Sequence, residues 1–369
     1  MSNKKPVVVY GASGYTGKLV IEYLREYQVP FIAAGRNKQR MEEALALIPG
    51  IETADYDVVE VEHTVEALTE LLDGAQVICN TVGPFAYFGE AVIQAAANTK
   101  VHYMDTTGEQ SFMLEMREKY GDAFAANGKI LAPSVAYMNT VLDICAHVVL
   151  EEPGVDTLDG GCIASGVPTY GSTQTIFAMF QSEHLYLEGN QLVPWQKGRG
   201  FELSVPGKVM TQLSHPWGGG SLPVWFLDDG RVHSAAQLTA FTNRPMYESI
   251  IALQKHYEDD IKKLPVNEQE AALKEIAEGM QPGMPPRENK LVNRTTDYVI
   301  GTGSGVKKTC VINTTVPYQL TGVVQAGLAA YLLKSEPQRA GFVSACQAAG
   351  HSYMTGAVRN FIPMEIDVY

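Results

Sequence analysis

The chain has 369 residues, of which 46% are hydrophobic, and its formal net charge is −13. At about 150 residues per domain, this length predicts two domains with a sizeable buried core. The negative charge argues against nucleic acid and anionic membranes as partners. No apolar run approaches the roughly 20 residues of a membrane span. The expected first strand begins near residue 7, which leaves no room for a signal peptide.

The five cysteines are scattered along the chain and lack the spacing of metal ligands. Such a set is typical of reduced, buried thiols in the cytosol. We therefore expect a cytoplasmic protein with no metal site.

The start of the chain carries the strongest motif. Residues 7–9 are three valines, which predict a buried strand, and residues 18–27 have apolar side chains at helical spacing. A Gly-x-x-Gly-x-x-Gly pattern joins them. Such a turn lets a pyrophosphate approach the backbone and sit on the helix N-terminus. The expected cofactor contacts in the turn are Gly11, Ser13, Gly14, Tyr15, Thr16 and Gly17.

The second expected strand, residues 31–35, indicates which cofactor is bound. Arg36, Asn37 and Lys38 follow it, and the 40 N-terminal residues hold seven Lys or Arg against two Glu. An acidic residue at this position binds the ribose 2′-hydroxyl of NAD, whereas an Arg accommodates a 2′-phosphate. We expect NADPH as the cofactor, with contacts from these three residues. Alternatively, Arg36 and Lys38 have no role in cofactor binding and are only polar, solvent-exposed residues at the start of a helix.

Strands and helices alternate over the first 133 residues. This order predicts right-handed crossovers and a doubly wound parallel sheet, in which ligands bind beyond the carboxyl ends of the strands. The expected strands are 7–9, 31–35, 51–56, 75–80, 101–105 and 129–132, and the expected helices are 18–27, 39–47, 64–72, 90–98 and 112–126.

The segment after the fourth strand should pass under the nicotinamide ribose. The expected contacts there are Thr81, Val82, Gly83, Pro84 and Phe85. Alternatively, the segment is a turn at the end of a strand with no role in cofactor binding.

The rest of the chain has a different pattern. Residues 140–150 look helical, the stretch to about 317 is strand-like and rich in loops, and residues 248–279 predict an amphipathic helical pair. The last fifty residues turn helical again. We expect an α/β protein with an N-terminal Rossmann domain (1–135), a second α+β domain for substrate and dimerisation (136–317), and C-terminal helices (318–369) that return to the first domain.

Four motifs in the N-terminal part resemble those of a known family. They are Gly-Ala-Ser-Gly-Tyr-Thr-Gly (11–17), Ala-Gly-Arg-Asn (34–37), Asn-Thr-Val-Gly-Pro-Phe (80–85) and His-Tyr-Met-Asp-Thr-Thr-Gly-Glu (102–109). In this order they resemble the saccharopine dehydrogenase-like reductases, in the branch that contains the trans-acting enoyl reductases. The family's usual Phe-Asp-x-Val-Pro-Ser segment is replaced by Ala-Pro-Ser-Val-Ala-Tyr-Met-Asn at 132–139. Because of this departure, the family's substrate class does not carry over directly to this chain.

Candidate proton donors come from two places. Tyr137 follows the sixth strand, and Tyr318 opens an Ala-rich helix together with Thr321; both phenols could act in general acid catalysis. The loop at 215–221, with Trp195 and Trp225, either lines an apolar pocket or packs in the core. Acyl-phosphate and semialdehyde reductases share the first motif, but they need a nucleophilic Cys that residues 132–141 lack.

The resemblance implies an NADPH-dependent reductase that transfers hydride to a conjugated C=C bond of a hydrophobic small molecule. Reduction of an imine, as in the parent family, is one alternative, and a non-catalytic NADPH-binding scaffold or sensor is another. We expect a homodimer, no nucleic acid and no membrane span.

Overall fold

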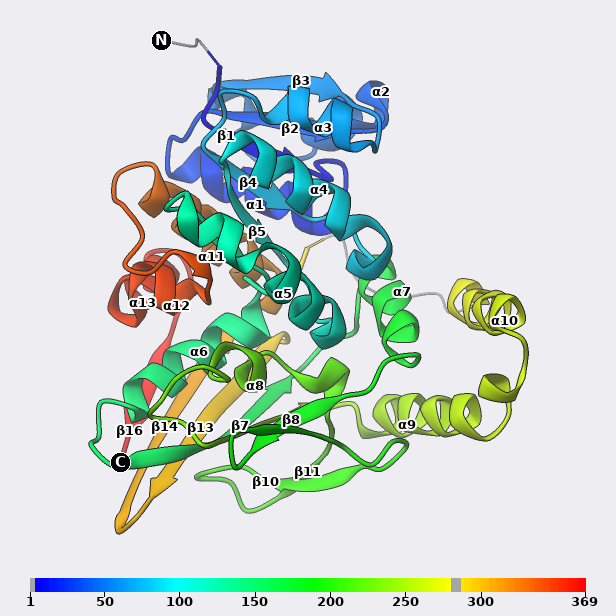
Figure 1. The fold of residues 1–369 in the computed structure, drawn as a ribbon, viewed down its shortest axis with the longest axis vertical. Coiled ribbons are helices and arrows are strands. Elements are labelled where there is room, and N and C mark those ends of the chain that lie inside the picture. The colour runs from blue at the N-terminus through cyan, green and yellow to red at the C-terminus, as the bar shows by residue number, and fades with distance from the viewer. Residues whose placement is uncertain (1–3, 280–286) are drawn as a thin grey trace. The chain divides into compact units, whose positions relative to one another are not determined.

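The computed structural model describes residues 4–279 and 287–369, which form two compact units (Figure 1). The first unit comprises the described residues up to Thr107 together with 112–140 and 318–363. The second comprises 108–111, 141–317 and 364–369.

The first unit is built on a parallel sheet of seven strands in the order β15-β6-β5-β4-β1-β2-β3. The valines of β1 are fully buried, as is usual for a central parallel strand covered on both faces. The expected doubly wound sheet is therefore confirmed. Its strands are β1 (Val7–Tyr10), β2 (Phe31–Gly35), β3 (Tyr56–Glu60), β4 (Val77–Asn80), β5 (His102–Asp105), β6 (Ile130–Ala132) and β15 (Gly341–Phe342).

Helices cover this sheet; α3, for example, buries one apolar stripe, whereas α11 is buried on nearly all sides. On α3 the stripe is Leu68, Leu71 and Leu72, and the side chain of Thr64 caps the helix by accepting from the N–H of Ala67. The helices of the unit are α1 (Tyr15–Glu26), α2 (Lys38–Leu45), α3 (Val65–Leu72), α4 (Phe85–Thr99), α5 (Gln110–Ala126), α6 (Tyr137–Val149), α11 (Pro317–Leu332), α12 (Ala345–Ala349) and α13 (His351–Arg359), some of which extend into the second unit.

Three expectations about this unit were wrong in detail. The third strand is not 51–56, because Gly50 adopts a left-handed conformation and residues 51–53 form a 3-10 turn, η1 (Ile51–Thr53). The helix expected at 90–98 begins at Phe85. The C-terminal region is not purely helical, since it adds β15 to the first sheet and β16 (Glu365–Val368) to the second.

The second unit is built on a mixed sheet of nine strands. Its main path runs β10-β11-β12-β7-β13-β14-β16, and β8 and β9 form a side branch on β12. This confirms a second domain based on a more open sheet. Its remaining strands are β7 (Val155–Ala164), β8 (Leu185–Glu188), β9 (Gln191–Pro194), β10 (Phe201–Ser204), β11 (Thr211–His215), β12 (Ser234–Phe241), β13 (Arg294–Gly303) and β14 (Val306–Thr315).

The helical pair expected at 248–279 is confirmed. Tyr257 and Leu273 belong to its two helices, and both join a buried apolar cluster with Ile176 and Phe177. Within the described residues, no helix of the chain is long and apolar enough to cross a membrane. The helices of this unit are α7 (Tyr170–Met179), η2 (Trp217–Gly219), α8 (Leu222–Trp225), α9 (Arg244–Asp259), η3 (Ile261–Lys263) and α10 (Val266–Gly279).

Candidate functional site

The glycine-rich turn after β1 is shaped by its own backbone. Gly11 has a φ of +92°, and its N–H donates to the carbonyl of Ala34, while the N–H of Gly14 donates to the carbonyl of Gly11. A Cβ on Gly17 would lie 2.3 Å from the Gly11 carbonyl oxygen. Gly11 thus supplies a conformation that other residues avoid, and Gly17 permits the close approach of α1 to the turn.

Gly14 has a different position in the turn. It precedes α1 in an extended conformation, and among the described residues no side chain caps that helix. Apart from its chain neighbours, the Gly11 oxygen is the one heavy atom that the described residues bring within 4 Å of a Cβ built there. Gly14 is exposed, and Ser13, Tyr15 and Thr16 are half-buried around it. This open cradle on a helix N-terminus fits a pyrophosphate.

The residues after β2 are exposed, and two of them hold the local structure. The side chain of Asn37 caps α2 by accepting from the N–H of Arg40 at 2.8 Å, and the N–H of Lys38 donates to Glu60 Oε2 at 2.7 Å. Burial raises the pKa of Tyr10, and the charge of the nearby Arg36 guanidinium opposes this rise. Burial and then the charge of Arg36 lower the pKa of His63. Arg36 remains the cation suited to a 2′-phosphate.

The segment after β4 contacts the glycine-rich turn directly. Thr81 donates both its N–H and its hydroxyl to the carbonyl of Tyr10, each at 2.9 Å. A Cβ on Gly11 would lie 2.6 Å from the Thr81 hydroxyl oxygen. The N–H of Val82 donates to Asn80 Oδ1, and the Gly83–Pro84 peptide is cis. The structure therefore brings the segment 81–84 beside the turn, as expected from the order of the strands.

A buried polar network lies at the ends of β5 and β6. The carboxylate of Asp105 accepts from the N–H groups of Thr107 and Ser134 at 2.9 Å and from the hydroxyl of Tyr103 at 2.8 Å. Burial raises the pKa of Asp105 to about 6, and the three donors act in the opposite direction. Asn80 donates to the Tyr103 hydroxyl. Asp105 thus positions the two chain segments that leave β5 and β6.

The two expected proton donors are placed differently. Tyr137 is buried, and its N–H donates to the hydroxyl of Thr321 at 3.0 Å, so Thr321 joins α6 to α11. Tyr318 is half-buried, and its ring packs edge-on against Tyr15 of the glycine-rich turn at a centroid distance of 5.5 Å. Of the two phenols, Tyr318 is therefore the one next to the turn.

The aromatic loop of the second unit packs in the interior. Trp217 stacks near Tyr247 and Phe241, and Trp225 is buried. Burial lowers the pKa of His215 to about 4 and so keeps this side chain neutral. The loop at 215–221 is therefore a packing element.

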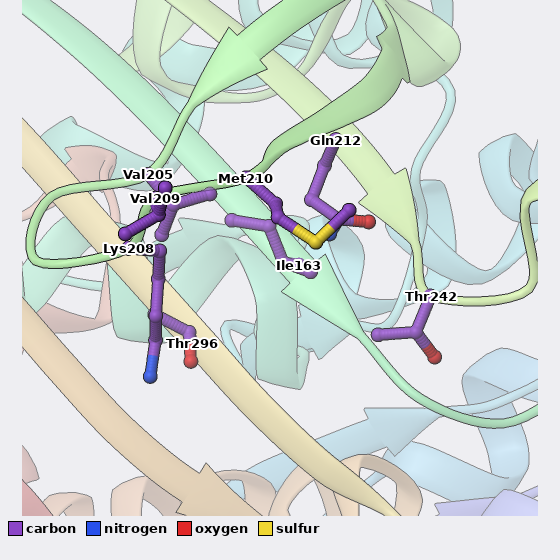
Figure 2. Close-up of a pocket in the computed structure, with 8 residues that line it drawn as sticks. All are labelled: Ile163, Val205, Lys208, Val209, Met210, Gln212, Thr242 and Thr296. Carbon is purple, nitrogen blue, oxygen red and sulfur yellow. The ribbon is translucent and has the colours of Figure 1, made fainter.

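A separate apolar hollow of about 360 Å³ lies on the second unit (Figure 2). Val209 and Met210, at the tip between β10 and β11, are strongly exposed on its rim. The hollow is lined by Ile163, Val205, Lys208, Val209, Met210, Gln212, Thr242 and Thr296.

The first unit thus has the architecture of a dinucleotide-binding domain, with a glycine-rich turn between its central strand and the following helix. Residues 7–128 match the saccharopine dehydrogenase NADP binding domain, which confirms the resemblance seen in the four motifs. Residues 140–366 match a family of unknown function, DUF5938. This second match covers more than half of the chain, so the protein belongs to that family.

Named relatives match about a third of the chain. The chain is 32% identical over 146 residues to the lipid droplet localized protein of Caenorhabditis elegans, which covers 37% of this chain and 34% of that relative. It is 33% identical over 125 residues to the trans-acting enoyl reductase of Mycobacterium leprae, with coverage of 33% and 30%. The matches therefore span about a third of each relative's length.

One solved structure has the same overall fold. Apo saccharopine dehydrogenase (L-Glu forming) from Saccharomyces cerevisiae matches 99% of this chain and 100% of its own, with a TM-score of 0.61 at 12% identity. This likeness concerns the fold alone.

Proposed function

We propose that the protein is an NADPH-dependent reductase that transfers hydride to a conjugated C=C bond of a hydrophobic small molecule. The observation that carries the cofactor assignment is the open cradle at Gly14 together with Arg36 after β2. Bound NADPH supplies the hydride, and the protein supplies binding, orientation and electrostatics.

Each part of the first unit has a role in this proposal. Residues 11–17 bind the pyrophosphate, residues 36–38 bind the adenosine 2′-phosphate, and Thr81–Phe85 lie beside the nicotinamide. Tyr318, next to the turn, or solvent delivers the proton that completes the reduction. Tyr137 stays a second candidate donor, although its burial requires a change of side-chain position before it reaches a substrate.

Two of the five arginines in the second unit (Arg199, Arg231, Arg244, Arg287 and Arg294) are paired with carboxylates, which favours an apolar substrate over an amino-acid imine. A dicarboxylate would need paired Arg forks. Arg231 is bound to Asp229, and Arg244 is bound to both Glu202 and Glu248. These guanidinium groups are already paired with carboxylates of their own unit. The second candidate function, imine reduction, has the support of the family resemblance.

A cytoplasmic location and a homodimeric state are part of the proposal. All five cysteines are free, buried thiols, which suits a reducing compartment. Light scattering coupled to size exclusion tests the dimer.

Turnover distinguishes the candidate reactions. Purified protein is mixed with NADPH and, in separate arms, cyclic enones, enoyl thioesters, cyclic imines, and α-keto acids with amines; NADPH oxidation is followed by absorbance and the product by mass spectrometry. A product two hydrogens heavier in the enone or enoyl arms supports the proposal. Turnover in the imine or keto-acid arms alone would replace it with imine reduction. Tight NADPH binding without turnover in any arm would favour a non-catalytic NADPH-binding scaffold or sensor.

A further inference from the structure

An aromatic cluster lies beside Arg36 and has no part in the motifs above. His63, in the segment between β3 and α3, stacks on Tyr10 with ring centroids 6.0 Å apart and an interplanar angle of 8°. Phe88 of α4 meets the same imidazole edge-on at 5.4 Å. Tyr10 ends β1, and Arg36 follows β2. The cluster therefore lies where consecutive parallel strands end, and that edge is where a dinucleotide binds in such sheets.

The cluster offers partly exposed aromatic rings next to a cation. Phe88 and Tyr87 are adjacent aromatic residues with 36% and 54% of their surface exposed. An aromatic ring at this exposure can stack on a purine, and the guanidinium of Arg36 can hold a phosphate in a charge-assisted contact. A flat heterocycle that carries a phosphate matches both features.

The hydrogen bond of His63 determines which nitrogen faces outward. The hydroxyl of Tyr10 lies 2.9 Å from His63 Nδ1. In the neutral tautomer that carries its proton on Nε2, the phenol donates to Nδ1, and the Nε2–H can donate to a ligand. When the imidazole is protonated, Nδ1 donates to the phenol oxygen instead. The same contact therefore accommodates both protonation states.

Burial and the charges around His63 determine its protonation state in the ligand-free protein. Burial and then the positive charge of Arg36 lower the pKa of His63, so the ring is neutral near pH 7. Its own segment contributes Glu60 and Glu62, and Glu60 is bound to the N–H of Lys38. A phosphate placed between Arg36 and His63 would oppose the effect of the guanidinium and favour the imidazolium.

We propose that Arg36, His63 and Phe88 form a subsite for a 2′-phosphorylated adenosine, in which Phe88 covers the purine ring and His63 takes up a proton as the phosphate binds. The inference rests on the proposed NADPH dependence and deepens it. Cofactor choice is then linked to pH, because the phosphorylated cofactor binds more tightly in acid through His63 and the unphosphorylated one does not.

The test uses the full-length protein and two probes, 2′,5′-ADP and 5′-AMP, in isothermal titration calorimetry. Each titration is repeated in two buffers of different ionisation enthalpy near pH 7, which counts the protons taken up. The wild-type protein should take up a measurable fraction of a proton with 2′,5′-ADP and less with 5′-AMP. Equal uptake by the wild-type protein and His63→Gln on binding 2′,5′-ADP would overturn the role of His63.

Substitutions then test whether His63 is the group that takes up the proton. His63→Gln keeps a polar side chain that does not titrate, and we expect it to lower 2′,5′-ADP affinity about 3- to 10-fold near pH 6 and little near pH 8.5. Titration of the ligand's own phosphate affects wild type and variant alike, so only the difference between them counts. His233→Gln, at an exposed histidine of the second unit, is the matched control and should bind as wild type. An unchanged pH profile in His63→Gln would overturn the proposal.

Phe88→Leu tests the purine contact. It should weaken 5′-AMP and 2′,5′-ADP by the same factor, about 5- to 10-fold, because both carry the purine. Unchanged affinity for both probes would remove Phe88 from the subsite. If the wild-type protein binds NADPH but His63→Gln behaves as wild type, this inference alone fails. If the wild-type protein binds neither NADPH nor 2′,5′-ADP, the proposed function fails with it.

Discussion

Gly14 and Gly17 belong to one turn but meet different surroundings. Gly14 has φ −72° and ψ 164°, an extended conformation open to β-branched residues, and a Cβ there would lie 3.1 Å from the Gly11 oxygen. At Gly17 the same oxygen would lie 2.3 Å away. The fold thus requires the absence of a side chain at Gly17, whereas a Cβ at Gly14 needs the Gly11 carbonyl to shift by only a few tenths of an ångström.

We predict that Gly14→Val folds but no longer binds NADPH, because the isopropyl group occupies the place of the pyrophosphate. Gly17→Ala should instead lower the free energy of unfolding by about 1–3 kcal/mol through overpacking. Thermal melts compare the stability of the two variants, and calorimetric titration measures binding. Unchanged NADPH affinity in a folded Gly14→Val protein would move the cofactor site away from this turn.

In the proposed function, Arg36 determines the choice between the two nicotinamide cofactors. A charge-assisted hydrogen bond contributes about 1.5–3 kcal/mol, so Arg36→Ala should weaken NADPH binding by roughly one to two decades and leave NADH nearly unchanged. The control, Arg359→Ala, removes one positive charge from an exposed position on α13 and should alter neither affinity. Equal weakening of NADPH and NADH by Arg36→Ala would contradict the assignment.

Helix α11 approaches α1 at a glycine. A Cβ on Gly322 would lie 2.7 Å from the carbonyl oxygen of Leu19, whereas a Cβ on Gly356 in α13 would have no heavy atom of the described residues within 4 Å beyond the backbone of its own helix. The two glycines therefore form a matched pair, both inside helices of the first unit.

Gly322→Ala should force α11 away from α1 and lower the free energy of unfolding by about 1–3 kcal/mol. Gly356→Ala should be neutral or stabilise the protein by up to about 1 kcal/mol, because alanine has the higher helix propensity. Chemical denaturation of both variants against wild type makes the comparison. A Gly322→Ala protein as stable as wild type would show that the two helices can separate without cost.

Local patterns predicted the elements that depend on neighbouring residues. The valine run, the glycine spacing and the apolar periodicity of α1 lie within 20 residues, so the strand, turn and helix could be placed from the sequence. The strand order then put Thr81 beside the turn. The pair Tyr10–His63, by contrast, joins residues 53 apart, and the contact between Tyr137 and Thr321 joins residues 184 apart. No local pattern marks such partners, and β15 is a two-residue strand formed only by pairing with β6.

Three buried histidines make the whole molecule sensitive to acid. Burial is the main cause that lowers the pKa of His102, His184 and His215 to about 4 in the folded protein. Between the ordinary histidine pKa of about 6.5 and this value, the unfolded chain binds protons that the folded protein does not. The free energy of unfolding therefore falls as the pH falls through this window. Asp105 acts in the opposite direction, because its raised pKa lets the folded protein keep a proton that the unfolded chain loses.

The effect of the three histidines on the free energy of unfolding is larger than that of Asp105. At 1.36 kcal/mol per pKa unit, each histidine lowers the free energy of unfolding by about 2 kcal/mol near pH 5, and Asp105 raises it by about 1 kcal/mol. The net decrease is comparable to the lower range of total protein stability. We predict that the melting temperature stays nearly constant from pH 8 to about pH 7 and drops steeply from pH 6 to pH 4.5. His184 and His215 both lie in the second unit, so its calorimetric transition should move further than that of the first unit. His215→Gln should reduce the slope of that transition with pH, and a melting temperature independent of pH down to about pH 5 would refute the burial of neutral histidines as the cause.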